Sequence, residues 1–524
     1  MSITVEVSKI AGAEPGAGGT VRVTSPATGE LVGEVPDVDA AGVAEAVARA
    51  RAAAPGWAAT SLDDRKEALL RWRDLVLDTP LVPETLVKES GKPRHEAEGI
   101  EVLYLCELVR AMTRLSRRAF AEETRNPLLF LTKKTRLVRH PLGVVGVIGP
   151  WNFPILNNAA DAVAPLLAGN AVVLKPSEIT PLTSCVLRDL WVKAGNPPDV
   201  FQVVTGRGAA GAALVDLVDA VMFTGSVATG RRIAARCGER LVPCVLELGG
   251  KSPFVVLPGA DLERAAEAAA WSSFIHSGQV CIRTERIYAH ASVADRFEEL
   301  LVARVAALRQ APPDPAGGAH DLGAVTFARQ IEVVERQIAD AVAKGARILV
   351  GGARRGSGPG LFFEPTVLSG VTHDMEVMRE ETFGPLVPVM RFWEVAEALA
   401  LANDTHLGLN ASVFGPPGEA EAFARRLRSG QAIVNDVLVN YFVVESPLGG
   451  WRASGLGVRH GIEGLRQWSR VEAVTTRRPL LAPVDRFLAK SLAFPYDPRV
   501  LAVLRRAMRL LYRRGLAAKL RRPS

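Results

Sequence analysis

The spacing of apolar residues predicts helices near the start of the chain and alternating strands and helices from about residue 143 onward. Between residues 37 and 78, Ala-rich spacing and a second amphipathic run predict two helices, with "SLDD" as a cap between them. Along "TKKTRLVRHPLG" the period shortens toward two, which predicts a strand. Runs such as "VVGVIG" and "AVVLKP" then alternate with helical runs such as "TSCVLRDLWVKAG". Such alternation is typical of βαβ units and a parallel sheet.

The same alternation from about 250 to 445 is long enough for a second α/β domain, in keeping with the two to four domains that the length suggests. Apolar residues make up 48% and charged residues 23%, as in a soluble globular protein. The first twenty residues lack the pattern of a secretory signal, and no apolar run is long enough to span a membrane. Five cysteines without a CxxC pair favour a reducing cytoplasm and predict no metal site and no disulfide framework.

The net charge of +7 is concentrated at the C-terminus. Residues 477–524 hold thirteen Lys/Arg and two Asp, so the rest of the chain is slightly acidic. Between Arg499 and Arg522, Val500, Leu504, Met508 and Leu511 fall on one helical face, and the opposite face holds Arg505, Arg506, Arg509 and Arg513. This basic amphipathic helix has three interpretations: it lies on an anionic membrane surface, docks on a partner subunit, or is a solvated appendage. No aromatic interleaving supports nucleic-acid binding.

One glycine motif has the form of a dinucleotide-binding loop. Gly206, Gly208 and Gly211 have G-x-G-x-x-G spacing after the apolar run "FQVV". The acidic residue expected about 20 positions later has no good candidate, since Asp216 and Asp219 come too early. We therefore favour a tight turn that opens a closely packed helix.

Four stretches carry candidate chemistry: "GPWNFP" with Asn152, "VVLKPSE" with Lys175 and Glu178, "LELGGKSP" with Glu247, and "GQVCIR" with Cys281. Singly, each has an ordinary explanation, such as a turn cap, a solvated strand end, a surface acid or a buried thiol. In this order and at these intervals, they resemble the aldehyde dehydrogenase superfamily. The resemblance runs over about residues 20–475 and includes "FTGSVATG", "EETFGP" and "PLGGWRASGLG".

The resemblance implies an α/β protein with the aldehyde dehydrogenase fold: a Rossmann-like parallel-sheet cofactor domain, a second α/β catalytic domain and a small β oligomerisation extension. The implied division is a NAD-binding domain (1–122 and 142–249), a catalytic domain (250–446), oligomerisation elements (123–141 and 462–476) and the basic tail (477–524). A homodimer or homotetramer is expected.

The resemblance also implies the reaction, which is oxidation of an aldehyde to its acid with NAD, or with NADP as the alternative. Cys281 would attack the carbonyl to form a thiohemiacetal, and the Asn152 amide with the Cys281 backbone N–H would hold the oxyanion. Glu247 would be the base for hydrolysis of the thioester. Two alternatives remain: an acylating enzyme that passes the thioester to coenzyme A, and a non-catalytic binding protein that kept the fold.

Cofactor residues are implied in the same way. Gly225 and Ser226 would hold the pyrophosphate at a helix N-terminus. Lys175 and Glu178 would contact the adenosine ribose, where a carboxylate favours NAD over NADP. The remaining implied cofactor residues are Trp151, Gly249, Glu381 and Phe383.

The substrate is left open between two classes of aldehyde. The implied funnel is mostly apolar or aromatic, which suits an aliphatic or aromatic aldehyde; its residues are Phe153, Val280, Ile282, Tyr441 and Phe442. The segment "RHGIEGL" gives some likeness to bacterial succinate-semialdehyde dehydrogenases, whose substrate would want an arginine. Arg283 is the candidate, although a scaffold role fits it equally well. The expected location is the cytoplasm, with membrane contact through the tail as one interpretation.

Overall fold

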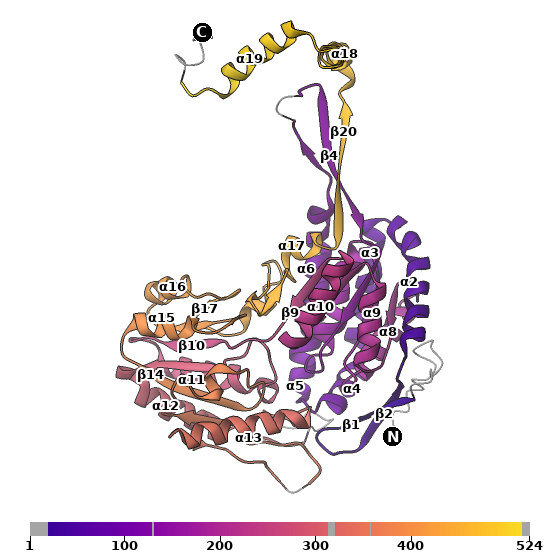
Figure 1. Ribbon diagram of the computed structural model, residues 1–524. Coiled ribbons are helices and arrows are strands. Elements are labelled where there is room, and N and C mark those ends of the chain that lie inside the picture. Colours follow the sequence, from indigo (N-terminus) through magenta and orange to yellow (C-terminus); the bar gives the residue numbers. More distant parts are fainter. Residues whose placement is uncertain (1–18, 128–129, 313–319, 357, 516–524) are drawn as a thin grey trace. The chain divides into compact units, whose positions relative to one another are not determined.

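The computed structural model describes residues 19–127, 130–312, 320–356 and 358–515. The chain divides into two units, which are described separately. The first comprises the residues up to Phe120 and Pro141–Ser469, and the second comprises Ala121–His140 and the residues from Arg470 onward. Figure 1 labels the elements of both units.

The first unit contains a six-stranded sheet of order β19-β9-β8-β5-β6-β7, parallel except for β19. Its strands are β5 (Val144–Ile148), β6 (Ala171–Lys175), β7 (Phe201–Val203), β8 (Ala220–Thr224), β9 (Cys244–Glu247) and β19 (Gly455–Leu456). The helices connected with it are α2 (Ala40–Ala59), α3 (Leu62–Asp78), α4 (Leu81–Ser90), α6 (Leu103–Phe120), α7 (Ala160–Leu167), α8 (Leu182–Lys193), α9 (Gly208–Leu217) and α10 (Val227–Arg240).

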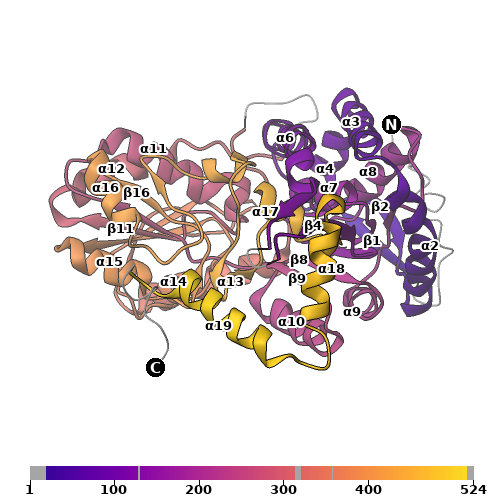
Figure 2. The same cartoon turned by 90° about the horizontal axis from the view of Figure 1, so that it is seen from above.

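Successive strand residues face opposite sides of this sheet, so each side has its own core. Val145 and Val147 belong to a cluster with α3, α6, α7 and α8. Val144 and Val221 belong to a second cluster with α2, α9 and α10. Figure 2 shows α6, α7 and α8 on one side of β8 and β9, and α9 and α10 on the other. The result is a three-layer α/β domain, as the alternating pattern predicts.

A seven-stranded sheet of order β12-β13-β14-β11-β10-β16-β17 forms the second half of this unit, parallel except for β12. Its core is also two-sided: Phe254 and Ile287 pack with α11 and α12, whereas Val255 and Tyr288 pack with α13, α15 and α16. The strands are β10 (Pro253–Val256), β11 (Arg286–His290), β12 (Arg347–Val350), β13 (Thr366–Ser369), β14 (Leu386–Phe392), β16 (Ser412–Phe414) and β17 (Ile433–Val434). The helices are α11 (Leu262–Phe274), α12 (Ala291–Ala306), α13 (Ala328–Ala343), α14 (Glu376–Arg379), α15 (Val395–Asn403) and α16 (Pro417–Ala424).

Short elements complete the first unit. Two two-stranded sheets are β1 (Thr20–Thr24) with β2 (Leu31–Pro36) and β15 (Leu407–Gly408) with β18 (Trp451–Arg452). The remaining short helices are α5 (Arg94–Glu96), η1 (Ala97–Val102), η2 (Ile155–Ala159), η3 (Ile275–Gly278), η4 (Val439–Phe442) and α17 (Gly461–Arg466). The parallel sheets and the second α/β domain confirm the predicted fold class.

The second unit is a three-stranded sheet followed by two helices. The strand order is β20-β4-β3, with β3 (Glu123–Arg125) antiparallel to β4 (Lys133–Pro141), and β20 (Ser469–Arg477) on the far side of β4. Asp485 of α18 (Ala482–Ser491) is buried, accepts from Thr132 Oγ1 at 2.7 Å and pairs with Arg477 at 2.5 Å. This carboxylate therefore ties α18 to the sheet. The short η5 (Pro479–Leu481) lies between them.

The predicted tail helix is α19 (Pro498–Tyr512), and its apolar side chains are exposed: Leu504 by 39%, Met508 by 52% and Leu511 by 61%. It begins at Asp497, whose side chain accepts from the Arg499 N–H. The part of the tail from 516 to 524, including Arg522, lies outside the described residues. Within the described parts of the chain, none of the helices is long and apolar enough to cross a membrane.

Candidate active site

The structure brings the Asn152 turn and the Cys281 loop together. Asn152 follows β5 and is buried, and its Nδ2 donates to the backbone oxygen of Gln279 at 2.8 Å. This bond uses one of the two amide hydrogens. Asn152 is in turn held by Lys92, whose Nζ donates to the Asn152 backbone oxygen at 2.9 Å and pairs with buried Glu101. Sequence analysis did not identify Lys92 or Glu101.

A left-handed turn before the cysteine sets the path of its loop. His276 and Ser277 have φ of 49° and 51°, and Gly278 has 74°. Two successive non-glycine residues in this region are uncommon, so the surrounding contacts must impose the conformation. Ser277 Oγ donates to Gly323 O at 2.9 Å, and Asn410 Nδ2 donates to Ile282 O at 2.9 Å. The cysteine loop is thus fixed on both sides of Cys281.

The Gly249-Gly250 pair lets the end of β9 approach this loop. A Cβ on Gly250 would lie 2.4 Å from the backbone oxygen of Cys281, and a Cβ on Gly249 would lie 2.5 Å from Glu381 Oε2. Both distances are too short for a side chain. Glu247 ends the strand only three residues earlier, so the approach allowed by these glycines brings the candidate base toward the candidate nucleophile.

Burial raises the pKa of both Glu247 and Cys281, but with different consequences for their protonation at neutral pH. Glu247 is 5% exposed, and its Oε1 has no hydrogen-bond partner among the residues that the structure describes. Desolvation raises the pKa of Glu247 to about 8, against the attraction of Arg459. Desolvation likewise raises the pKa of Cys281 to about 12, although its residue is partly exposed. The resting sulfur is therefore a thiol, and Glu247 can gain or lose a proton near neutral pH.

The predicted cofactor residues lie at the carboxyl ends of the first sheet's strands and next to the Gly-Gly segment. Lys175 ends β6, and its Nζ is 3.4 Å from Glu178 Oε2. Ser226 is the N-cap of α10 and follows Gly225, so this helix N-terminus opens at the end of β8. Trp151 and Phe383 pack edge to face with 5.5 Å between ring centroids.

Glu381 lies against the same Gly-Gly segment, where its Oε1 accepts from the Gly250 N–H at 3.0 Å. Burial raises the pKa of Glu381 to about 7. This arrangement fits a dinucleotide, because strand ends and helix N-termini bind its phosphates and ribose. It combines the strand ends of the first sheet, the N-terminus of α10, the Trp151–Phe383 ring pair and the Gly249-Gly250 segment.

Within the motif at Gly206, Gly208 and Gly211, close packing is found at Gly206, whereas a Cβ on Gly208 would meet nothing within 4 Å. Gly206 has φ of +136°, and a Cβ there would lie 3.1 Å from the backbone oxygen of Val38 and 3.2 Å from Asp37 Oδ1. The turn thus allows α9 to begin close to the segment before α2, as in the interpretation that sequence analysis favoured.

A cavity next to Cys281 is lined mainly by apolar side chains. Its lining residues are Ile100, Phe153, Leu156, Asn157, Trp271, Ile275, Val280, Cys281, Ile282, Leu438, Tyr441 and Phe442. All five residues expected to form the funnel are among them.

Arg283 is not at this cavity. It is fully buried, where its Nε donates to Glu285 Oε1 at 2.6 Å, and its two other nitrogens donate to the backbone oxygens of Ser273 and Leu386. Of its two interpretations, the scaffold role is confirmed, because every donor group is directed into the protein.

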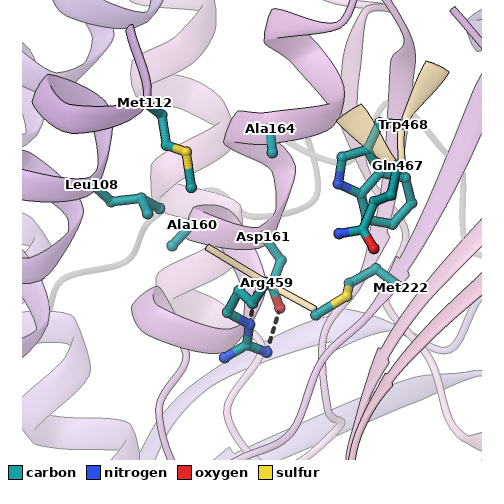
Figure 3. Close-up of a pocket in the computed structure, with 9 residues that line it drawn as sticks. All are labelled: Leu108, Met112, Ala160, Asp161, Ala164, Met222, Arg459, Gln467 and Trp468. Carbon is teal, nitrogen blue, oxygen red and sulfur yellow. Dashed lines mark hydrogen bonds and ion pairs between the residues drawn. The ribbon is translucent and has the colours of Figure 1, made fainter. Parts of the chain in front are cut away.

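A buried ion pair between Arg459 and Asp161, which was not predicted from the sequence, lies next to the residues that line this cavity. Arg459 Nη2 donates to Asp161 Oδ2 at 3.0 Å, and Figure 3 shows the pair beside Met222, Gln467 and Trp468. The only signal in the sequence was the segment "RHGIEGL", whose partner Asp161 is 298 positions away.

Comparisons with known proteins agree with this geometry. The model of the aldehyde dehydrogenase family matches residues 14–474. "Putative succinate-semialdehyde dehydrogenase" of Mycolicibacterium smegmatis, whose name specifies NADP(+), is 41% identical over 457 residues, which cover 86% of this chain and 88% of that protein. "4,4'-diapolycopene aldehyde oxidase" of Methylomonas sp is 39% identical, with 88% and 87% covered. A crystal structure of Mycobacterium tuberculosis aldehyde dehydrogenase complexed with NAD+ has a TM-score of 0.84 at 33% identity and covers 88% of this chain and 95% of that one.

The chain belongs to the aldehyde dehydrogenase family. It is an NAD(P)-dependent oxidoreductase with the aldehyde dehydrogenase fold, and it oxidises aldehydes by the mechanism typical of that family. The family acts on aldehydes as small-molecule substrates and is typically oligomeric.

Proposed function

We propose that Cys281 is the nucleophile, Glu247 the hydrolytic base and Asn152 the oxyanion donor of this oxidation. The observation that carries the proposal is the shared location of these groups. The Asn152 amide bonds the cysteine loop, and Gly250 allows the Glu247 strand end to reach the same loop. A buried carboxylate oxygen without a hydrogen-bond partner costs free energy. A bound water would supply that partner, and it would also be the water that Glu247 activates.

Each chemical step has a residue for it. The Cys281 thiol loses its proton to solvent water, and its sulfur bonds to the carbonyl carbon to form a thiohemiacetal. The Asn152 amide and the Cys281 backbone N–H donate to the oxyanion. The bound nicotinamide supplies the acceptor for the hydride. A thioester remains on Cys281, and Glu247 takes a proton from the water that hydrolyses it to the acid.

The test of these roles uses Cys281→Ser and Cys281→Ala with a broad panel of aldehydes. Both variants should lose NADH formation by about 10³-fold or more, because no other group can form the covalent intermediate. Cys106→Ser, which removes another partly exposed thiol, is the matched control and should keep its turnover. Substantial turnover in Cys281→Ala would overturn the assignment. Product analysis with and without coenzyme A tests the acylating alternative.

We propose the cofactor contacts on the same geometry. Lys175 and Glu178 would hold the adenosine ribose, Gly225 and Ser226 the pyrophosphate, and Glu381 the nicotinamide ribose. Trp151, Phe383 and Gly249 would shape the nicotinamide pocket. The support is the position of each at a strand end, a helix N-terminus or the Gly-Gly segment. Glu178 favours NAD, because its carboxylate accepts from a 2′-hydroxyl and repels a 2′-phosphate.

The substrate that the cavity favours is an apolar aldehyde, aliphatic or aromatic. No Lys or Arg is among the described residues that line the cavity, so a substrate carboxylate would lose hydration without gaining a partner. Trp271, which lines the cavity, is also 48% exposed and apolar. A long-chain substrate agrees with the name of the Methylomonas relative.

Succinate semialdehyde is the second candidate, favoured by the names of the mycobacterial relatives. Aldehydes graded in chain length and terminal charge separate the two. A kcat/KM that rises with chain length supports the apolar class, and a maximum at the four-carbon acid semialdehyde supports the other.

We further propose a homodimer or homotetramer in the cytoplasm that contacts an anionic membrane through α19. From Pro498 to Tyr512 this helix has no acidic residue, and its exposed leucines and arginines suit lipid chains and anionic headgroups. Sedimentation with vesicles should show binding to phosphatidylglycerol and not to phosphatidylcholine alone. Leu504→Asp with Met508→Asp should abolish it, whereas the exposed Leu77→Asp should not. Equal binding by all variants would contradict the proposal.

A further inference from the structure

Arg459 is a buried arginine that binds two of the side chains lining the cavity beside Cys281. It is 8% exposed, and its donors reach four elements. Nη1 donates to Asn157 Oδ1 at 2.7 Å and to the Tyr441 hydroxyl at 2.5 Å. Nη2 donates to Asp161 Oδ2 at 3.0 Å and to Thr224 Oγ1 at 2.7 Å. Only a guanidinium has enough donors in a fixed plane to satisfy this set.

Two of these acceptors are walls of the substrate cavity. Asn157 and Tyr441 both line it beside Cys281, and the Tyr441 hydroxyl also donates to Asn157 Oδ1 at 2.9 Å. Arg459 therefore joins a triangle that fixes both side chains against the cavity. Tyr104 adds support from α6, since its ring lies 4.9 Å from the Tyr441 ring.

A third acceptor connects Arg459 to the base. Thr224 of β8 is the register partner of Glu247 in β9, so the two residues are neighbours across the parallel strands. Arg459 therefore binds the side chain of the residue that lies beside Glu247 in the neighbouring strand. The fourth acceptor, Asp161 of α7, balances the buried charge (Figure 3).

We propose that Arg459 is a positioning residue for the oxidation, which holds the Asn157–Tyr441 wall in place and supplies a buried positive charge toward Cys281 and Glu247, with Asp161 setting how much of that charge they experience. The proposal rests on the proposed function of Cys281 and Glu247. A purely structural arginine would satisfy its hydrogen bonds without affecting either group.

The charges around Arg459 support this. Desolvation raises the pKa of both Glu247 and Cys281, and the attraction of Arg459 is the largest effect that opposes it. The titratable groups that face Arg459 are Asp161, Tyr104, Glu247, Tyr441 and Cys281, with His460 next in the chain. Desolvation and Arg459 lower the pKa of His460 to about 3, so His460 stays neutral.

The test measures the alkylation of Cys281 by iodoacetamide, resolved by mass spectrometry of its peptide, in the complete chain without cofactor. Arg459→Met with Asp161→Asn removes both charges and leaves no lone buried ion, which would otherwise destabilise the fold. At a fixed pH of about 8, its alkylation rate should fall by about tenfold, because one pKa unit changes the thiolate fraction tenfold. Asp161→Asn alone should change the rate in the opposite direction, since Arg459 then acts unopposed.

Arg459→Lys separates position from charge. Lysine keeps the positive charge but lacks the planar set of guanidinium donors. The alkylation rate should therefore stay near that of the wild type, while KM for the aldehyde rises. Arg286→Lys is the matched control, because Arg286 is also fully buried and bonds backbone oxygens such as Lys251 O away from the cavity. Its alkylation rate and KM should both be unchanged.

An unchanged alkylation rate in the folded double variant, with folding checked by thermal melting, would overturn the proposal. The same holds if Asp161→Asn and the double variant shift the rate in the same direction. The failure of the proposed function is a separate outcome, in which Cys281→Ala keeps its turnover.

Discussion

Two buried glutamates in the same unit, Glu285 and Glu247, show how similar burial can lead to opposite chemistry. Glu285 is 1% exposed and accepts from Lys251 Nζ at 2.6 Å, Arg283 Nε at 2.6 Å and the Thr382 N–H at 3.0 Å. Burial alone would raise its pKa, but the two cations outweigh it and lower the pKa of Glu285 to about 2. Within the described part of the chain, Glu247 Oε1 has no partner, and desolvation raises the pKa of Glu247 to about 8.

The difference lies in what surrounds the carboxylate, since burial is nearly equal. The donors to Glu285 leave it permanently charged, and it holds in place the 381–383 segment of the proposed cofactor site. Among the residues that the structure describes, Glu247 Oε1 has no donor, and this leaves the carboxylate able to exchange a proton with a bound water. A deeply buried acid is thus a fixed anchor when its oxygens are saturated and a candidate base when one is not.

The largest effect should come from Glu247→Gln. Turnover should fall by about 10²- to 10⁴-fold, because the amide cannot take a proton from water. The first half-reaction does not need this base, so a burst of about one NADH per site should remain in rapid-mixing experiments. If the burst is lost together with turnover, Glu247 acts before the thioester forms.

Glu285→Gln should mainly cost stability. It leaves Lys251 and Arg283 buried without their counter-charge, which destabilises a protein by about 3–5 kcal/mol. Chemical denaturation should show this loss, while Glu247→Gln should show none. Equal stability losses in the two variants would remove the distinction between the glutamates.

Glu247 and Glu285 should affect the pH dependence of stability in opposite directions, and Glu247 should also set the pH dependence of turnover. The turnover number should rise between about pH 7 and 9 with a midpoint near 8, because Glu247 acts as a base only when deprotonated. Folded Glu247 retains a proton that the unfolded chain loses near pH 4.3, so its contribution to the free energy of unfolding falls as pH rises to about 8. Glu247→Gln should remove this fall in pH-dependent melting.

Glu285 should behave in the opposite way. Its folded pKa lies below the unfolded value, so its contribution is complete above about pH 4.5 and is lost as the pH falls toward 2. Acid melting of wild type and Glu285→Gln should therefore converge at low pH.

The smallest expected effect concerns Glu178, a partly exposed carboxylate that pairs with Lys175. Glu178→Gln should raise kcat/KM for NADP a few-fold, since one charge that repels the 2′-phosphate is removed. It should lower kcat/KM for NAD by a similar factor, since the carboxylate no longer accepts from the 2′-hydroxyl. Lys193→Gln, a surface change on α8, is the control. Unchanged preference would place the 2′ position elsewhere.

The sequence predicted the parts of the fold and site that depend on local pattern. The alternation from 143 onward predicts β5, β6 and the helices between them, and the tail spacing predicts α19. The segments around Asn152, Glu247 and Cys281 have motifs of fixed local form, and the Asn152 side chain and Gly250, three residues after Glu247, both contact the Cys281 loop.

The contacts between distant residues could not be predicted in this way. Asp161 is in an Ala-rich helix pattern, and its link to Arg459 exists only after α7 and the loop before α17 have packed. Glu285 likewise has no local signal in the sequence, because its donors Lys251 and Thr382 come from separate loops. Hydrogen-bond partners decide the chemistry of a buried acid, and spacing along one strand does not reveal them.

The close approach at Gly250 has a consequence for how this enzyme can vary. The position where a Cβ would stand is already filled by the Cys281 carbonyl oxygen. Even alanine there would force the two loops apart and separate the sulfur from the acid that completes its chemistry. A single hydrogen atom in place of a methyl group is what keeps the two halves of the reaction within reach of the same substrate.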